Sequence, residues 1–375
     1  MNKKRFLLVI FSLLMNIGIY SCQSPTESTS STTRPNNPTN PPMTSGWNIP
    51  EGEIVSGGVP KDGIPSLFDP VKILAEQADY LSDEDLVVGI VVGDKAIAYP
   101  HTILDWHEVV NEKIQGKTLT VSYCPLTGTA VVFDGEILGR QLKFGVSGLL
   151  FNNNLIMFDR DTDSHWPQLR LQCDEGALRD TKQIPYPSIE TSWGTWKKLY
   201  PDTEILSAST GFNRPYQRPG TAYPDYDLPN SPPLFQMKDL DKRLPFKQRV
   251  HGVLAGSGPD NFKSKVYSID SNQEQRLIHD SVGSKEILVI DVGQENFVTS
   301  YVRIVNGAAL TFKLAETATF PFTFKDNETG STWNVLGEAI AGPLAGAKLD
   351  KPTSFNAFWF AWGAFYKGAE IYSNE

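Results

Sequence analysis

Residues 119–133 read LTVSYCPLTGTAVVF, in which two apolar runs flank a turn that contains proline and glycine. The runs Leu119–Tyr123 and Ala130–Phe133 are rich in β-branched and aromatic residues, which pack well on a pleated surface. Pro125 cannot continue a ladder of strand hydrogen bonds, and Gly128 permits a tight turn. The stretch therefore predicts two neighbouring strands joined by a short connection.

Similar short runs lie on both sides of this stretch, at Leu86–Val92, Ala96–Tyr99 and Gln141–Val146. The chain has 30 glycines and 26 prolines in 375 residues, which indicates many turns rather than long helices. Three helices are expected, over Ile103–Asn111, Ser192–Tyr200 and Phe355–Tyr366. Strands in groups with isolated helices predict an α+β fold, mainly antiparallel β with few helices.

Two distant segments resemble each other: FDRDTDSHW at 158–166 and FKDNETGSTW at 324–333. The spacing that follows is also kept, because 34 residues separate Trp166 from Tyr200 and 33 separate Trp333 from Tyr366. Similarity at a fixed spacing is the signature of an internal repeat. We therefore predict two degenerate repeat halves, over roughly 84–210 and 286–373.

The N-terminus is typical of a bacterial lipoprotein signal peptide. Lys3, Lys4 and Arg5 precede an apolar run of 15 residues, which is shorter than the roughly 20 that a membrane span needs. The run ends in IYSC, with an aliphatic residue three positions before the cysteine, a small residue directly before it and then Cys22, as in a lipobox. We expect cleavage before Cys22 and its lipidation, with an ordinary signal peptide as the alternative.

The segment after Cys22 consists almost only of Ser, Thr, Pro and Asn, which favours a disordered tether. The predicted organisation is a signal peptide 1–21, a tether 22–46, a first half 47–212 with the functional site, a connector 213–285 and a second, degenerate half 286–375. These features predict an extracytoplasmic protein of the bacterial cell envelope, lipid-anchored on the periplasmic or surface side. The net charge of −9 argues against nucleic acid as a partner, because phosphate binding requires clustered Lys and Arg.

Two nearby segments contain the candidate chemistry. His107 lies at the edge of an apolar stripe on the expected helix, where an imidazole must find a partner or stay neutral. Cys124 ends a strand beside the turn, and Thr127 follows it with a hydroxyl that would stabilise a thiolate or a bound anion. The alternatives are a core histidine, a buried cysteine that acts as a small apolar residue, or a disulfide between Cys124 and Cys173.

If Cys124 and His107 meet, two kinds of site are open. With His101 added, thiolate and imidazole form a metal-ligand set that suits copper or zinc. Without a metal, Cys124 would be a nucleophile and His107 its base. Glu108 or Asp105 would then orient the imidazole, and Thr127 with the turn amides would receive developing charge.

Six short segments of the chain together resemble the uncharacterised prokaryotic family called domain of unknown function 3179. They are AYP (98–100), WHEVVN (106–111), YCPLTGT (123–129), FGVSG (144–148), NLIMFDR (154–160) and GEAIAGPLAG (337–346). The resemblance covers roughly residues 56–373 and implies no established activity. The family often has Cys-Pro-Leu-Cys-Gly-Thr where Thr127 replaces the second cysteine here, so a dithiol cycle within this turn is impossible.

The sequence thus predicts a lipid-anchored envelope protein with a Cys/His site that binds a transition metal or uses a thiolate nucleophile. The alternative is a non-catalytic surface module that binds a glycan or protein ligand. Expected partners are the membrane, through Cys22, and a small-molecule, metal or glycan ligand. Whether the protein is an enzyme is left open.

Overall fold

The computed structural model of the chain describes residues 46–217, 223, 226–314 and 319–373. The chain divides into two compact units, 1–40 and 41–375, and every described residue belongs to the second. The predicted signal peptide 1–21, the lipidated Cys22 and all of the tether except Gly46 lie outside the described residues.

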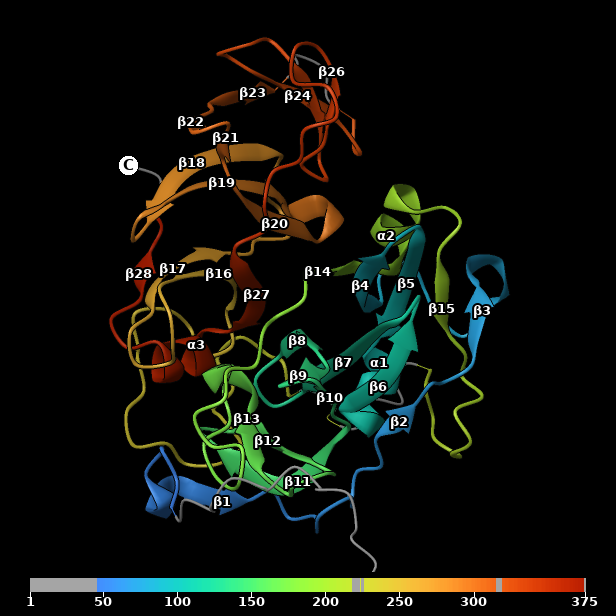
Figure 1. Cartoon of the computed structure of the whole chain (residues 1–375), viewed down its shortest axis with the longest axis vertical. Helices are drawn as coiled ribbons and strands as arrows, with labels where there is room; N and C mark the ends of the chain where they lie inside the picture. The colour runs from blue at the N-terminus through green and yellow to red at the C-terminus, as the bar shows by residue number, and fades with distance from the viewer. Residues whose placement is uncertain (1–45, 218–222, 224–225, 315–318, 374–375) are drawn as a thin grey trace, which may run out of the picture. The chain divides into compact units, whose positions relative to one another are not determined.

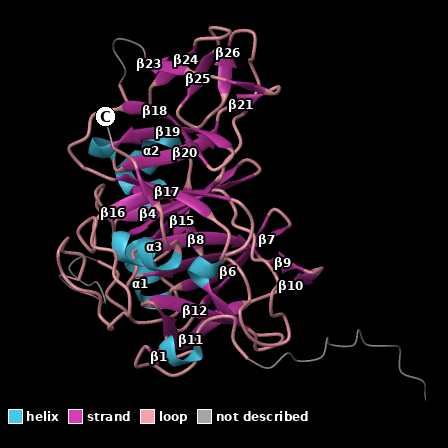
Figure 2. Cartoon of the chain, turned by 90° about the vertical axis from the view of Figure 1, so that its left-hand side faces the viewer, coloured by secondary structure: helices cyan, strands magenta, loops and turns pink. Residues whose placement is uncertain are grey.

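Strands dominate the described part of the chain, and they pair mostly antiparallel (Figure 1), which confirms the α+β class with little helix. Among the described residues, the three α-helices are α1 (His101–His107), α2 (Trp193–Leu199) and α3 (Trp359–Phe365). Figure 2 shows these short cyan helices scattered among magenta strands. The 3-10 helices are η1 (Glu51–Glu53), η2 (Ala75–Gln77), η3 (Gln168–Arg170) and η4 (Gly293–Glu295).

Residues 54–206 form three sheets with the orders β14-β4-β5-β15-β3, β2-β6-β7-β8 and β1-β11-β12-β13, and a small hairpin β9–β10. All neighbours are antiparallel except β15 with β5 and β2 with β6. The bounds are β1 Ile54–Ser56, β2 Leu67–Phe68, β3 Lys72–Leu74, β4 Leu86–Val92, β5 Lys95–Pro100, β6 Val109–Ile114, β7 Lys117–Cys124, β8 Thr129–Asp134, β9 Glu136–Ile137, β10 Arg140–Gln141, β11 Phe144–Phe151, β12 Asn154–Asp159, β13 His165–Pro167, β14 Ser188–Ser192 and β15 Glu204–Leu206.

Residues 249–371 form sheets with the orders β27-β16-β17-β28, β18-β19-β20 and β23-β24-β25-β26, and a hairpin β21–β22. Here β28 is parallel to β17. The bounds are β16 Arg249–Ala255, β17 Lys263–Ser268, β18 Arg276–Val282, β19 Lys285–Val292, β20 Phe297–Val302, β21 Ile304–Val305, β22 Ala308–Ala309, β23 Phe312–Leu314, β24 Thr323–Asp326, β25 Thr332–Asn334, β26 Ala339–Ala341, β27 Thr353–Phe358 and β28 Glu370–Ile371.

The arrangement β14-β4-β5-β15 recurs as β27-β16-β17-β28. In each, a helix follows the first strand of the order and leads to a short strand that runs parallel to its neighbour. In each, a helix tryptophan lies against a strand glycine, since a Cβ on Gly89 would lie 2.2 Å from Trp196 and a Cβ on Gly252 would lie 2.1 Å from Trp362.

The similar segments 158–166 and 324–333 also fold alike. Trp166 Nε1 donates to Asp159 at 3.0 Å, and Trp333 Nε1 donates to Asp326 at 2.9 Å. Common origin of the two halves stays a prediction. Strands β16, β17 and β18 lie within the range 213–285 that the sequence predicts as a connector.

Two of the expected helices differ from those observed. The helix predicted over Ile103–Asn111 ends at His107, and Val109 begins β6, which pairs with β7. The helix predicted over Phe355–Tyr366 begins only at Trp359, because the residues before it pair with β16. In both places, pairing with a neighbouring strand outweighs a helical pattern of apolar residues.

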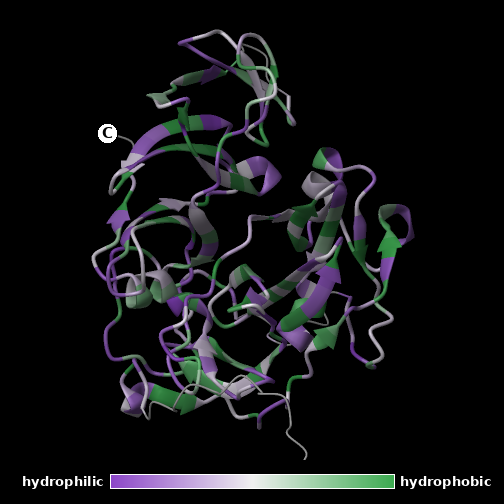
Figure 3. Ribbon diagram, in the orientation of Figure 1, coloured by the Kyte–Doolittle hydropathy of each residue, from purple (hydrophilic) through white to green (hydrophobic). Residues whose placement is uncertain are grey.

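The cores are rich in aromatic side chains, and Trp166, Trp196, Trp333 and Trp362 are fully buried. In Figure 3 the green, hydrophobic segments lie mainly in the strands. Within the described ranges, none of the helices has the length and apolar character required to cross a membrane.

Candidate functional site

Cys124 is the last residue of β7 and pairs with Thr129 at the start of β8. Its thiol is 1% exposed and donates to the Asn153 carbonyl at 3.6 Å. The turn that follows is tight: Gly128 has φ 57°, and a Cβ there would lie 3.0 Å from the Phe358 ring. The second half of the chain therefore packs directly on the cysteine turn.

The Cys124 thiol is held in its neutral form. Burial raises its pKa to about 11, with a further contribution from the Glu108 carboxyl. The Thr127 hydroxyl acts in the opposite direction, because a hydrogen bond to the thiolate lowers the pKa. Thr127 thus lies where the sequence placed it, as a group that stabilises the charged form of the sulfur.

Glu108 follows α1 directly and has φ 54° and ψ −32°. This backbone conformation is costly for a residue with a side chain, and such positions cluster at functional sites. The side chain is buried, and burial together with nearby Asp105 raises its pKa to about 8. The structure therefore places a buried carboxyl with a raised pKa near a thiol whose pKa is also raised.

His107 has other partners. Its Nδ1 lies 2.7 Å from the Pro65 carbonyl and its Nε2 lies 2.6 Å from the Tyr216 hydroxyl. Burial lowers the pKa of the imidazole. Within the described part of the chain, no hydrogen bond joins His107 to Cys124. The Thr127 hydroxyl bonds to the thiol and the Glu108 carboxyl affects its pKa, but among the described residues no hydrogen bond joins the Glu108 or His107 side chain to it.

His101 belongs to a different group of side chains. Its ring lies 4.3 Å from that of Tyr123, and its Nε2 lies 4.0 Å from Glu190, which also pairs with Arg249. Adjacent residues of a strand point to opposite faces, so Tyr123 and Cys124 face different sides of β7. The proposed set of Cys124, His107 and His101 is not assembled around one point.

No group of three or more His, Cys, Asp or Glu side chains among the described residues is placed to hold a metal ion. Cys124 and Cys173 are both free and buried, so the predicted alternative of a disulfide between them is not formed. The Cys173 thiol donates to the Glu175 carbonyl at 3.2 Å.

The buried side-chain amides of Asn154 and Gln168 form hydrogen bonds to the turn that follows Cys124. Asn154 Nδ2 donates to the Thr127 hydroxyl at 3.0 Å and to the Gln168 side chain at 2.8 Å. Gln168 in turn donates to the Thr129 carbonyl at 3.2 Å. The family-like segment 154–160 contained a signal for Asn154, but Gln168 stands outside every segment singled out in the sequence.

Two tyrosines from the predicted connector complete the surroundings. Tyr226 donates to the Leu126 carbonyl at 3.0 Å, which ties this connector to the cysteine turn. Burial raises the pKa of Tyr223, and the next largest contributions come from Glu108 and then Cys124, so all three share one environment. No local pattern marks these tyrosines, because only the folded chain brings them to the turn.

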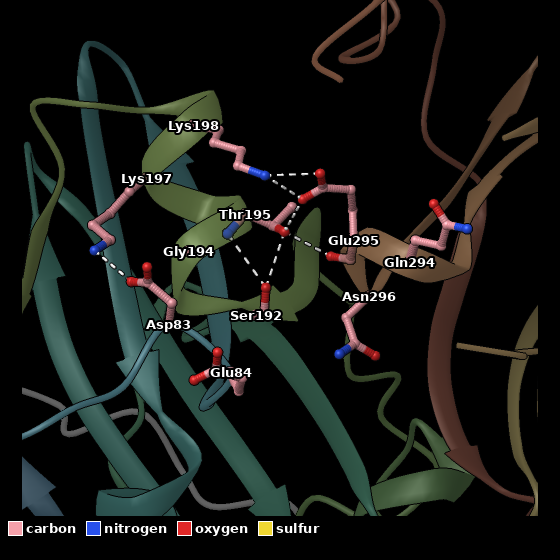
Figure 4. Close-up of a pocket in the computed structure, with 10 residues that line it drawn as sticks. All are labelled: Asp83, Glu84, Ser192, Gly194, Thr195, Lys197, Lys198, Gln294, Glu295 and Asn296. Carbon is pink, nitrogen blue, oxygen red and sulfur yellow. Dashed lines mark hydrogen bonds and ion pairs between the residues drawn. The ribbon is translucent and has the colours of Figure 1, made fainter. Parts of the chain in front are cut away.

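A large open pocket of about 540 Å³ lies elsewhere, between α2 and η4 (Figure 4). Its lysines already have partners, since Lys197 pairs with Asp83 and Lys198 with Glu295, each at 2.7 Å. Thr195 donates to the Glu295 carbonyl at 2.7 Å. None of the site residues predicted from the sequence lines this pocket.

These features define a class of α+β protein, mainly antiparallel, with a buried thiol and carboxyl at the end of a hairpin. The chain belongs to the family described as "Protein of unknown function (DUF3179)", whose model matches residues 61–369. No match was found among curated proteins or among solved structures.

Proposed function

We propose that this is a lipid-anchored protein of the bacterial cell envelope that uses Cys124 as a nucleophile and Glu108 as its proton acceptor. Cys22 carries the lipid, and residues 22–46 form the tether. The observation that supports the site most strongly is Glu108, a buried carboxyl in a strained backbone conformation beside the thiol.

The chemistry follows from the two acidities. Near neutral pH, a carboxyl with a pKa of about 8 exchanges its proton readily, and it can accept one and later return it. The thiol, with a pKa of about 11, keeps its proton until that transfer occurs. When the proton passes from sulfur to Glu108, the thiolate forms beside a neutral acid, and its electron pair forms the bond to an electrophilic centre of a small-molecule substrate. The bond from that centre to its leaving atom breaks at the same time, and Glu108 returns the proton to the leaving atom, which takes the electron pair.

Glu108 replaces His107 in this proposal because both imidazole nitrogens already have partners. The transition-metal version, with copper or zinc, has weaker support. The thiol's described surroundings contain carboxyl groups, whereas the two histidines bond elsewhere or lie beside Glu190.

We further propose that the two halves are copies of one unit and that the second has lost the site. The hairpins β7–β8 and β19–β20 each join strands of eight and six residues through a four-residue turn. Matched from these turns, Val292 stands at the position of Cys124 and Arg276 at that of Glu108. The second half therefore keeps the framework without the reactive pair.

A non-catalytic ligand-binding module is the second candidate, and one cleft favours it. This cleft of about 530 Å³ is lined by Phe151, Phe262 and Phe365, with Arg170 and Asp260 beside them. Aromatic faces beside fixed polar groups are typical of ligand sites, including those for sugars. Glycan binding that persists in a Cys124→Ser variant would support this candidate over the nucleophile.

The pH profile of alkylation tests the nucleophile. In detergent-solubilised whole protein carrying Cys173→Ser, only Cys124 remains in the body to react with iodoacetamide. We expect the rate to show an inflection near pH 8, where Glu108 ionises and becomes able to accept the proton. In the Glu108→Gln variant this inflection should be lost. An unchanged profile would show that Glu108 takes no part.

A further inference from the structure

A second group of polar side chains lies where the two halves of the body meet, away from the cysteine turn. Two four-residue segments face each other across a cavity of about 70 Å³, namely 185–188 and 351–354. The first leads into β14 and the second into β27, which contact each other. Prolines at 185, 187 and 352 stiffen both walls, since each fixes its own φ.

Lys351 is one of the residues that line this cavity. Its ammonium donates to the Thr299 hydroxyl and lies 4.5 Å from the centre of the Tyr301 ring. Among the described residues, no carboxylate lies within ion-pair distance of it. Burial of an ammonium without a counter-charge is costly, and here it lowers the Lys351 pKa to about 7.

Other charged groups near the cavity are paired, except that the second Glu190 oxygen, Oε2, is buried without a hydrogen-bond partner in the described part of the chain. Glu190 pairs with Arg249 on β16, and Lys117 pairs with Asp134 at 2.8 Å near the Tyr186 wall. His251 faces the same region, with its Nδ1 2.9 Å from the Asn356 side chain and its Nε2 3.0 Å from the Ser300 hydroxyl. Among the described charged groups around this cavity, Lys351 is thus the cation without an ion-pair partner.

Hydroxyl groups complete the lining. Ser188 and Ser354 border both this cavity and the smaller adjoining space that contains His251 and Glu190. Thr353 adds a third hydroxyl. A cavity of about 70 Å³ suits a single small anionic group rather than a larger metabolite.

We propose that this cavity binds a small oxyanion, either a tetrahedral one such as phosphate or a carboxylate. The Lys351 ammonium supplies the counter-charge, and the hydroxyls of Ser188, Thr353 and Ser354 donate hydrogen bonds to the anion's oxygens. The site is independent of the proposed chemistry at Cys124, and it would link the two halves of the body through a shared ligand.

Titration calorimetry tests the proposed anion site directly. Phosphate and acetate are titrated into the whole protein in detergent, with sodium chloride at matched ionic strength as the control. We expect saturable binding of at least one of the two oxyanions at pH 6. The one that binds more tightly indicates whether the site prefers a tetrahedral oxyanion or a carboxylate. Affinity should fall at least tenfold by pH 8.5, because the ammonium loses its proton over this range.

Two variants separate this site from general surface binding. Lys351→Met should weaken oxyanion binding at least tenfold, whereas Lys348→Met, which removes an exposed lysine paired with Glu338, should leave it unchanged. Ser188→Ala should weaken binding severalfold and serves if Lys351→Met does not fold. The proposal would be overturned if neither oxyanion bound more strongly than chloride. It would also be overturned if the Lys351→Met and Ser188→Ala variants bound the oxyanion as tightly as the wild type does.

Discussion

The hairpins β7–β8 and β19–β20 have the same construction but different chemistry. Their strands match in length, and each turn contains a residue with positive φ, Gly128 at 57° and Asn296 at 49°. At the end of the first strand, one hairpin has Cys124 and the other has Val292. The comparison teaches that register and core packing specify the framework, while a few side chains at the turn differ, and on our proposal these decide whether the hairpin is reactive.

The segment that precedes each hairpin differs as well. Between β5 and β6 the chain forms α1 and then the strained Glu108, whereas the equivalent stretch between β17 and β18 has no helix. Arg276, which follows that stretch, pairs with Asp291 at 2.7 Å. A paired cation thus occupies the place that the buried Glu108 carboxyl has in the first half.

The largest effect should come from the shared framework. Trp196→Ala and Trp362→Ala each remove a fully buried ring that lies against a strand glycine, and each should lower the free energy of unfolding by about 4 kcal/mol. Urea unfolding of both variants measures this. If only one of them is destabilised, the two sheets do not have equivalent roles in stability.

The next effect concerns Glu108 and depends on pH. Its pKa is raised on folding, so the folded state holds this proton more tightly than the unfolded state. Its contribution to stability is fully present below about pH 4.5 and is lost as the pH rises through about 8. Between pH 5 and pH 8, the free energy of unfolding of Glu108→Gln should therefore rise by on the order of 3 kcal/mol relative to that of the wild type.

Glu76→Gln, which changes an exposed carboxyl, is the matched control and should show no such gain. Chemical denaturation at several pH values gives both curves. Parallel curves for the wild type and Glu108→Gln would mean that Glu108 ionises normally in the folded protein.

A smaller effect should come from the loops that the two similar segments form. Asp326 is buried, which raises its pKa, but bonds from Trp333 and Thr329 outweigh this and lower it overall. Asp326→Ala should lower the free energy of unfolding by about 2 kcal/mol at pH 7. This loss should shrink in acid. A carboxyl whose pKa is lower in the folded than in the unfolded protein stabilises the fold at pH values above the unfolded-state pKa, and this stabilisation is lost as the pH falls through the folded-state pKa.

Asp159→Ala in the first half tests whether the two loops are equivalent, since Asp159 accepts a bond from Trp166 in the same way. Thermal unfolding at pH 7 should show a similar loss for both variants. A loss confined to one loop would indicate that the shared sequence pattern has a structural role in only one half.

The strands predicted at Leu86–Val92, Ala96–Tyr99, Leu119–Tyr123 and Ala130–Phe133 are observed, whereas the run predicted at Gln141–Val146 covers the end of β10 and the start of β11, with Leu142 and Lys143 between them. Leu86–Val92 was predicted to the residue, and Leu119–Tyr123 lies within the observed strand Lys117–Cys124. Such runs are decided locally by β-branched side chains and by turn residues. The front of the helix predicted over Phe355–Tyr366 was wrong because its residues pair with β16, a segment about one hundred positions earlier. Only the folded chain supplies that partner.

The site was predictable only in part, for the same reason. Cys124 and Thr127 share one turn, so their proximity followed from the sequence. His107 and Glu108 are neighbours in the chain, and the pattern could not show which of them faces the thiol. That choice depends on Pro65 and Tyr216, which hold the imidazole, and on the positive φ of Glu108, which redirects the chain after α1.

The smallest effect on stability and the clearest effect on chemistry should come from Cys124→Val, which gives the first hairpin the residue of the second. Valine is close to cysteine in size, and Val292 is buried at the equivalent place, so the melting temperature should change by no more than a few degrees. Alkylation at this position should vanish, while Cys173→Val, at a buried cysteine outside the turn, leaves it intact. A much larger fall in the melting temperature would mean that the thiol contributes mainly to packing. The two hairpins would then differ in how they fill the core rather than in reactivity.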